Sequence, residues 1–543
     1  MKKNIKKLMS MLLVLTMVVA LFAGCQGGTK DPTTVPKDTQ PQGGDPKPTE
    51  PEDTLSGTIT IGVIARTGSQ EGYEAVAAAY KEKHPNVEIV IDLKALDGYA
   101  DWIASLNNVD NPDVDIAECT AGEFDHTRLL VLSDYLDVDS PYSDGAWGEQ
   151  FENAGLSASP ITGEQVELSL FSTQIVWIYN QAIFDEVGVE PPTTWDEFVV
   201  VCEKIAAAGY QPIAQSYQYL TEWLAQIYMD QTTRSTLSSI VAQPGDFCYD
   251  PDVDGKWTMD ITDPYNDAND RVNKNIVRAL KAVKDGVLSL DTVGARTVWN
   301  NFAKVFPHYA GGDAFFTVGG DGISDLFYQS KAAMTFQVGG ALIAFQRTLD
   351  ELQANGSYVD PNGNTVSANV FTLGTFSMPS MTGDGIEAPV RTIEVPSSDF
   401  CILKKDQEHN DLVMDFLMFY TSEEGMSLYV DAMLAAGGTM DGPCLVNGVN
   451  YPDKYAPMFE NLKSIGNVQV GYAYAFASSV PYITESAREF DNMAYEYLNG
   501  RMSVDDFMSS ANANILKYLP YLQQALNISD ADLENPANAP VGN

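Results

Sequence analysis

The chain has 543 residues, of which 32 are basic and 74 are acidic, so its formal net charge is −42. This charge disfavours nucleic acid and anionic membrane surfaces as partners. It also disfavours a polyanionic solute, although one local arginine could override the general field.

Residues 1–24 predict a lipoprotein signal peptide. Lysines precede an uncharged apolar run over residues 8–23, and a basic start followed by a short apolar stretch is typical of secretion. Cys25 directly follows Ala23 and Gly24, so we expect its thiol to become the lipid-modified N-terminus. A transmembrane anchor is the alternative, but the run is shorter than the roughly 20 residues that span a bilayer.

Residues 25–56 are rich in Gly, Pro, Thr, Asp and Lys and nearly lack large apolar side chains. Such a segment cannot bury enough surface to fold, so we expect a disordered linker behind the lipid anchor. Loss of the signal peptide, with its four lysines and no acids, leaves a mature charge of −46.

The cysteines that follow Cys25 predict buried thiols rather than a disulfide framework. Their number is odd, their spacing is wide and their neighbours are mostly apolar. They are Cys119, Cys202, Cys248, Cys401 and Cys444. The sequence has no CxxC or Cys/His cluster of the kind that holds structural zinc.

The folded part opens with alternating strands and helices. The patterning predicts strands over residues 57–66, 87–93 and 113–118, with helices over 71–84 and 99–107 between them. This order predicts a parallel sheet with right-handed crossovers. Because ligands of such sheets lie beyond the carboxyl ends of the strands, we expect Arg66 and Glu118 near a binding site. Ordinary solvation of loops is the alternative for each.

Residues 172–214 form the stretch with the most specific sequence pattern. A strand over 175–179 leads to Pro191 and Pro192, and Thr194 with Glu197 three residues later predicts a capping box. The whole segment resembles the extracellular solute-binding proteins of bacterial ABC importers, within the oligosaccharide-binding group that includes maltose-binding protein. The matching residues are Asn180, Phe184, Gly188, Pro192, Thr194, Trp195, Glu197, Phe198, Gly209 and Pro212.

Further matches extend the resemblance over residues 57–524. Lys331–Gly339 resembles the family's K-x-AM-x-x-x-G strand, residues 406–425 its F-L-x-F-x-T-S-x-E-G helix pair, and residues 500–507 its closing helix. The resemblance implies a periplasmic-binding-protein-like α/β fold, in which two lobes surround a ligand cleft and a multi-segment hinge joins them. It places lobe one at 57–173 with 397–443, and lobe two at 174–396 with 444–526. Residues 231–329 are then an enlarged insertion, and 527–543 a C-terminal tail.

The resemblance also implies which side chains touch a ligand. Relatives supply aromatic rings to the sugar from the helix after residue 214 and from the stretch before the last helices. The corresponding residues here are Tyr217, Tyr219, Trp223, Tyr472 and Tyr474. Gly339 marks a strand that returns to the cleft, but the tryptophan that often follows is missing. A neighbouring aromatic residue such as Trp299, Tyr309 or Phe345 must then replace it, or the ligand is not stacked there. Packing of Trp223 in the core remains an alternative.

Asp250, Asp252 and Asp254, followed by Gly255, match the first half of an EF-hand calcium loop. The pattern then fails, because Ile261 stands where a bidentate glutamate belongs, and Asp260 would have to substitute. Two interpretations stay open: a structural Ca²⁺ loop, and an acidic turn that binds no ion. The sequence predicts no other cofactor.

The resemblance predicts a monomeric, non-enzymatic receptor on the extracellular face of the cell membrane. It would capture a carbohydrate, which the resemblance implies to be an oligosaccharide, and deliver it to the transmembrane subunits of an ABC permease. The sequence contains no GxSxG, HExxH or P-loop motif. The rival functions are a cell-surface carbohydrate-active enzyme and a sensor or adhesion lipoprotein built on the same fold.

Overall fold

The computed structural model describes residues 55–119, 124, 126–152, 165–268, 271–360, 362–459, 462, 465–469 and 484–541. They belong to one compact unit, Asp53–Asn543. The predicted lipidation site Cys25 and the predicted ligand contacts Tyr472 and Tyr474 lie outside the described residues. Within these residues, no helix combines the length and the apolar character needed to cross a membrane.

The first strands and helices follow the predicted order. They are β1 (Gly57–Ile64), α2 (Ser69–Lys83), β2 (Val87–Lys94), α3 (Tyr99–Leu106) and β3 (Ile116–Glu118). Strand β1 lies between β2 and β3 and pairs with both in parallel. The predicted β-α-β-α-β unit is therefore confirmed, and its strand ends carry Arg66 and Glu118 to one edge of the sheet.

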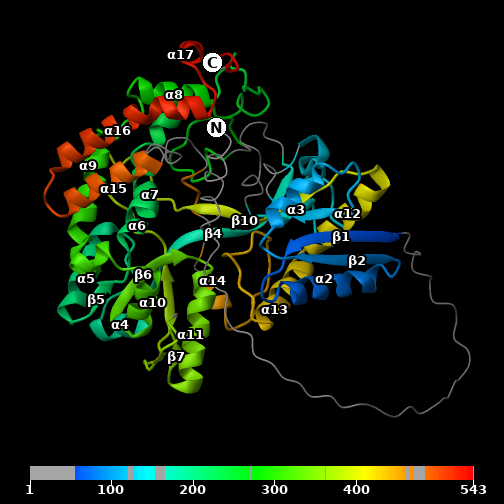
Figure 1. Cartoon of the computed structure of the whole chain (residues 1–543), viewed down its shortest axis with the longest axis horizontal. Coiled ribbons are helices and arrows are strands. Elements are labelled where there is room, and N and C mark those ends of the chain that lie inside the picture. Colours follow the sequence, from blue (N-terminus) through cyan, green and yellow to red (C-terminus); the bar gives the residue numbers. More distant parts are fainter. Residues whose placement is uncertain are drawn as a thin grey trace, which may run out of the picture. The chain divides into compact units, whose positions relative to one another are not determined.

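Two long strands, β4 (Glu167–Asn180) and β10 (Glu394–Ile402), run antiparallel through the middle of the sheet (Figure 1). The strand order is β2-β1-β3-β10-β4-β6-β5, and β9 (Leu373–Phe376) also pairs with β4. The sheet is thus mixed rather than parallel throughout. The prediction of a strand over 175–179 was too short, because the first half of β4 pairs with β10 and only its second half with β6 (Ala332–Val338).

Both predicted lobe boundaries near the middle of the chain fall inside these two strands. The boundary 173/174 lies within β4 and the boundary 396/397 lies within β10. Any movement of one part of the sheet against the other would have to bend β4 and β10, which is the place that the resemblance gives to the hinge.

The segment after β4 folds as its local sequence dictates. The Asn180 side chain accepts a hydrogen bond from the Ile183 N–H and caps α4 (Gln181–Val187). Thr194 and Glu197 form the predicted capping box at the start of α5 (Trp195–Ala207). The buried stripe on α5 holds Phe198, Val201, Cys202 and Ile205, as predicted, and the short strand β5 (Gln211–Ile213) follows.

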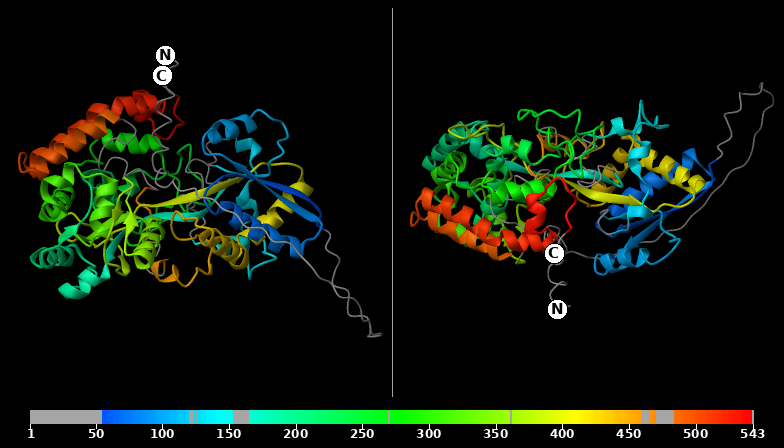
Figure 2. Two further views of the ribbon diagram at one scale, coloured as in Figure 1. Left: turned by 60° about the horizontal axis from the view of Figure 1, so that its bottom comes forward. Right: turned by 90° about the horizontal axis from the view of Figure 1, so that it is seen from above.

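The helix region predicted over 406–425 is two helices, α12 (Gln407–Tyr420) and α13 (Glu423–Ala435). The Ser422 hydroxyl accepts from the Gly425 N–H and so begins a new helix one turn after the first ends. Helix α13 packs against α2. Helices α15 (Thr484–Leu498) and α16 (Val504–Ala525), in orange and red, lie side by side in each view (Figure 2).

The other elements are shorter or lie around the sheet. The α-helices are α6 (Tyr217–Tyr219), α7 (Ala225–Asp230), α8 (Ile276–Lys284), α9 (Val293–Val305), α10 (Gly320–Tyr328), α11 (Ala341–Asn355), α14 (Ala456–Phe459) and α17 (Asp530–Glu534). Single turns are η3 (His126–Arg128), η4 (Leu132–Tyr135), η5 (Trp147–Gln150), η7 (Leu220–Leu224), η8 (Arg234–Ser239), η9 (His308–Ala310) and η10 (Gly312–Phe316). A small hairpin pairs β7 (Tyr358–Val359) with β8 (Thr365–Val366).

A buried arginine ties the insertion after residue 231 to the segment that leads into β10. Arg391 is 2% exposed and donates to both carboxylate oxygens of Asp230, at 2.6 and 3.0 Å, and to Asp267 at 2.7 Å. Burial by itself would lower the pKa of Arg391, but the charges of Asp230 and Asp267 raise it above its usual value. Because Asp267 lies in the insertion and helps to compensate this buried charge, it anchors the insertion to the folded unit.

Four of the five predicted buried thiols are buried, namely Cys119, Cys202, Cys401 and Cys444, and Cys248 is half-buried. Burial raises the pKa of the Cys202 and Cys444 thiols. A thiol that stays protonated is a poor nucleophile, so these cysteines act as small apolar residues.

Candidate ligand-binding site

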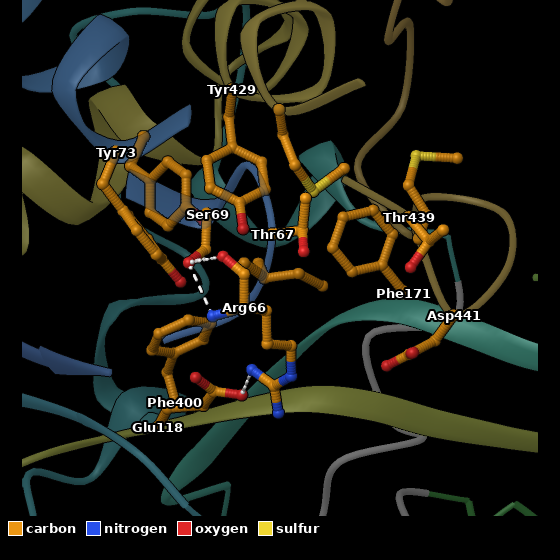
Figure 3. A pocket seen from close by; sticks show the side chains of 14 residues that line it. Arg66, Thr67, Ser69, Tyr73, Glu118, Phe171, Phe400, Tyr429, Thr439 and Asp441 are labelled. Atoms are coloured by element: carbon orange, nitrogen blue, oxygen red, sulfur yellow. Dashed lines mark hydrogen bonds and ion pairs between the residues drawn. The ribbon is translucent and has the colours of Figure 1, made fainter. Parts of the chain in front are cut away.

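A small cavity lies where β1 and β3 end (Figure 3). Arg66 and Thr67 follow β1, Ser69 and Tyr73 begin α2, and Glu118 ends β3. The other lining residues are Leu170, Phe171, Phe400, Tyr420, Tyr429, Met433, Thr439, Met440 and Asp441. The cavity measures about 30 Å³, whereas small-molecule pockets measure about 300–1,000 Å³. By itself it is therefore too small to hold a whole sugar ring.

The structure brings the predicted residues Arg66 and Glu118 into contact. The Arg66 guanidinium donates to Glu118 Oε1, and the side chains are 51% and 7% exposed. Glu118 Oε2 also accepts from the Ile64 N–H at 3.0 Å, which fixes the carboxylate. Burial lowers the pKa of Arg66, but the charges of Glu118 and Asp441 outweigh this effect and raise it.

The turn that carries Arg66 is held by Ser69. The Ser69 hydroxyl donates to the Arg66 carbonyl at 2.8 Å, and it accepts from the Arg66 N–H at 3.1 Å. Gly68 precedes α2 with φ of 77°, a conformation that glycine adopts readily. A Cβ at this position would also lie 2.4 Å from the Met433 carbonyl oxygen, so only glycine lets the turn approach α13.

Three tyrosine side chains supply the neutral polar groups of the cavity. Tyr73 comes from α2, Tyr420 from the end of α12 and Tyr429 from α13. The rings of Tyr73 and Tyr429 are 4.9 Å apart, and those of Tyr420 and Tyr429 are 5.6 Å apart. Burial raises the pKa of all three, so their hydroxyls stay protonated. The buried Tyr420 hydroxyl has no hydrogen-bond partner among the described residues.

Two further acids lie close to the ion pair, Asp399 on β10 and Asp441 after α13. Burial raises the pKa of Asp399 to about 7, and the charges of Glu167, Glu118 and Asp441 add to the rise. A hydrogen bond from the Ser169 hydroxyl to the Asp399 carboxylate acts in the opposite direction. The site therefore has a negative electrostatic field despite Arg66.

Gly339 lies beside the loop that carries Asp441, and its hydrogen bond is made by the backbone. Its N–H donates to the Gln174 carbonyl at 2.7 Å, and the Gly340 N–H donates to the Asp441 carbonyl at 3.0 Å. A Cβ at Gly340 would lie 2.4 Å from the Met440 carbonyl oxygen. The absence of a side chain at Gly340 lets the start of α11 approach the 439–441 loop closely.

The aromatic residues predicted after residue 214 fall into two groups. Tyr219 and Trp223 form a pair with ring centroids 4.3 Å apart and planes tilted by 37°. Both are half-buried, and Trp223 lies on the π-helical turn η7, a rare geometry that often marks functional positions. Tyr217 instead packs against Phe315 and Phe316, and its hydroxyl donates to the Asp491 carbonyl on α15.

The expectation that Trp299 replaces the missing stacking tryptophan is wrong. Its side chain is fully buried in α9 and packs edge-on against Phe302, Phe490 and Phe507. A ring with no exposed face cannot stack on a ligand, so Trp299 is a core residue.

The aspartates of the predicted calcium loop bond to their own turn. Asp250 accepts from the Asp252 N–H at 2.8 Å, and Asp260 accepts from the Thr262 N–H at 2.9 Å. The buried Asp254 accepts from the Asn273 N–H at 2.7 Å. Within the described residues, no group of three or more His, Cys, Asp or Glu side chains is arranged to hold a metal ion.

The cavity residues that the sequence predicted, Arg66 and Glu118, lie at strand ends. The other polar residues of the site lie elsewhere and were not predicted. Tyr73, Tyr420 and Tyr429 lie on helices whose apolar spacing predicts only core packing. Asp399 lies in the middle of a strand, and Asp441 lies in a turn between glycines. Only the pairing of β3 with β10, in the register Phe400 to Glu118, brings Asp399 next to the site.

Comparisons with known proteins define the class. The family model of bacterial extracellular solute-binding proteins matches residues 66–427, more than half of the chain. The chain therefore belongs to the bacterial extracellular solute-binding proteins. Members of this class act as carriers rather than enzymes, which confirms the expectation of a non-enzymatic binding protein.

A protein of Pyrococcus horikoshii described as an uncharacterized ABC transporter extracellular-binding protein is 25% identical over 221 residues. The match covers 38% of this chain and 45% of that relative, so the chain matches less than half of the relative's length.

Solved structures share the fold at low sequence identity. A protein from Streptomyces coelicolor described as a "probable secreted solute-binding lipoprotein" has a TM-score of 0.53 and 15% identity, over 85% of this chain and 99% of that one. The bacterial solute receptor AcbH, described with an exclusive preference for β-D-galactopyranose, gives 0.52 and 13%, over 86% and 100%. A family 1 extracellular solute-binding protein from Bifidobacterium longum subsp. infantis gives 0.51 and 13%, over 85% and 99%. They confirm the predicted α/β fold.

Proposed function

We propose that this protein is a lipid-anchored receptor that captures a carbohydrate outside the cell and delivers it to the transmembrane subunits of an ABC importer. The observation that carries the proposal is the cavity at the ends of β1 and β3, where the Arg66–Glu118 pair lies among neutral tyrosine hydroxyls. Sugar hydroxyls both donate and accept, so they match a charged pair combined with phenol groups. The half-buried Tyr219–Trp223 pair adds aromatic surface suited to the C–H face of a pyranose.

A thermal-shift screen of the purified protein against neutral mono- and oligosaccharides tests the cargo class. A ligand at 100 times its dissociation constant should raise the free energy of unfolding by about 2.7 kcal/mol. Calorimetry then measures the affinity, and chromatography of the recovered sugar tests whether it is intact. Conversion of the sugar would favour the carbohydrate-active enzyme, and the absence of any shift would contradict the carbohydrate proposal.

Delivery to an importer is tested by uptake. Cells that lack this protein should lose uptake of the labelled sugar and regain it with the intact gene. If uptake persists while binding by the purified protein is normal, the sensor or adhesion function gains support. Whether the turn of Asp250, Asp252, Asp254 and Asp260 binds calcium is independent of either experiment, and chelation tests it separately.

The lipid anchor rests on the sequence around Cys25 and is tested separately. Cys25→Ser should release the protein into the medium or leave its signal peptide uncleaved, because no other residue can accept the lipid. Normal processing with unchanged membrane retention would contradict the anchor.

A further inference from the structure

The cavity at the ends of β1 and β3 contains one positive charge that is already neutralised. Among its described lining residues, Arg66 is the one cation, and Glu118 and Asp441 are acids. The Arg66 guanidinium donates to Glu118, whose carboxylate is held in addition by the Ile64 N–H at 3.0 Å. A carboxylate fixed in this way cannot move away when a ligand approaches Arg66.

A negatively charged ligand would meet unfavourable charge on several sides. Glu118 from β3 and Asp441 from the loop after α13 line the cavity, and Asp399 on β10 and Glu167 on β4 lie near them outside its lining. Burial raises the pKa of Asp399 to about 7, and the charges of Glu167, Glu118 and Asp441 add to the rise. A sugar carboxylate that approached Arg66 would have to share it with Glu118, and like charges brought together in a partly desolvated site disfavour binding.

The other polar groups of the cavity suit an uncharged ligand. Tyr73, Tyr420 and Tyr429 remain protonated, and Thr67 and Thr439 contribute hydroxyls. Tyr420 is 2% exposed, and its buried hydroxyl has no hydrogen-bond partner among the described residues. A buried hydroxyl without a partner gains from a ligand hydroxyl that reaches it.

We propose that Glu118 determines the charge specificity of this site: by holding Arg66, it admits uncharged sugars and excludes sugar acids. This inference rests on the proposed carbohydrate-binding function and goes beyond it by assigning the selection to one residue. Glu118 thus contributes to specificity by disfavouring acidic sugars as well as by allowing uncharged sugars to bind.

The test compares matched neutral and acidic sugars, namely galactose with galacturonate, glucose with glucuronate, and galactobiose with digalacturonate. The parent protein should bind each acid at least tenfold more weakly than its neutral partner. Glu118→Gln keeps the size of the side chain and frees the charge of Arg66, so the ratio of acid to neutral affinity should rise at least tenfold. Equal or tighter binding of the acids by the parent protein would overturn the inference.

Two further variants complete the design. Glu424→Gln removes an exposed acid that is paired with Lys83 at 3.1 Å, outside the cavity, and should leave the ratio unchanged. Arg66→Gln removes the cation, so acids should stay excluded even if Glu118→Gln fails to fold. A rise in the ratio of acid to neutral affinity in Arg66→Gln would overturn the inference, because it would show that exclusion does not depend on the charges around Arg66.

The outcomes also separate this inference from the proposed function. If the parent protein binds neither set of sugars, the choice of cargo is wrong, but a gain of galacturonate or glucuronate binding in Glu118→Gln still supports charge selection. If Glu118→Gln gains nothing while it folds normally, charge selection by Glu118 is wrong whatever the cargo.

Discussion

The cavity around Arg66 and the aromatic group around Trp223 offer opposite chemistry. In the cavity, an ion pair, acids and buried hydroxyls are fixed by hydrogen bonds from strand ends and turns. Around Trp223, rings are positioned by packing on a π-helical turn. The first arrangement distinguishes charge and hydrogen-bonding pattern, and the second supplies apolar area without strong directionality.

The comparison also shows that residue type alone does not reveal a role. Trp223 and Trp299 are both tryptophans on helices, yet one is half-buried beside Tyr219 and the other is enclosed by Phe302, Phe490 and Phe507. Burial decides whether an aromatic ring can contact a ligand.

The largest effect is expected from Trp299→Ala, which should lower the free energy of unfolding by about 3–5 kcal/mol because it leaves a large cavity in the core. Urea denaturation measures the loss. The matched variant Trp223→Ala should lose much less stability. If Trp299→Ala kept the parent's stability and lost ligand binding instead, the contrast between the two tryptophans would be wrong.

The acids of the cavity give a pH-dependent effect. The pKa of Asp399 is raised to about 7 in the folded protein, so its contribution to stability is complete below the unfolded value near 4 and is lost as the pH rises through about 7. Asp399→Asn removes this dependence and should stabilise the protein at pH 8 by at most about 4 kcal/mol relative to the parent. Thermal unfolding between pH 4 and 8 measures it.

A control with the opposite sign is available in the β7–β8 turn. Hydrogen bonds from Asn364 lower the pKa of Asp360, so its stabilising contribution is present above the unfolded pKa and is lost as the pH falls. Asp360→Asn should therefore cost stability at neutral pH and not at low pH. If Asp399→Asn and Asp360→Asn changed the pH dependence of stability in the same direction, the raised pKa of Asp399 would be contradicted.

A smaller effect is expected on binding at the aromatic group. Trp223→Ala should lower the affinity for the identified sugar by about 5- to 150-fold, or about 1–3 kcal/mol, because it removes an aromatic face on which the sugar stacks. Calorimetry on a variant shown to be folded provides the measurement. Tyr474→Ala, outside the described residues, is the companion variant, and unchanged binding in both would place the ligand away from these rings.

The smallest effect is expected from chelation. Because Asp250, Asp254 and Asp260 accept hydrogen bonds from backbone groups, we expect a chelator to leave the melting temperature unchanged. A fall in melting temperature that Asp252→Ala abolishes would establish the calcium loop instead.

The sequence by itself determined features that depend on neighbouring residues. The capping box of Thr194 and Glu197, the order of β1, α2, β2, α3 and β3, and the meeting of Arg66 with Glu118 follow from patterns that act within one element or at adjoining strand ends. The family was also predictable from a local sequence motif, because the motif around residues 180–212 lies in one continuous stretch.

Only the tertiary structure decided what depends on distant segments. The register of β10 against β3 and β4 places Asp399 beside Glu118 and makes the sheet mixed. The packing of α2, α12 and α13 brings Tyr73, Tyr420 and Tyr429 to one cavity, and the rings around Trp299 enclose it. Periodicity reports which face of a helix is apolar, but it cannot report which neighbour covers that face, and that neighbour separates a core residue from a binding residue.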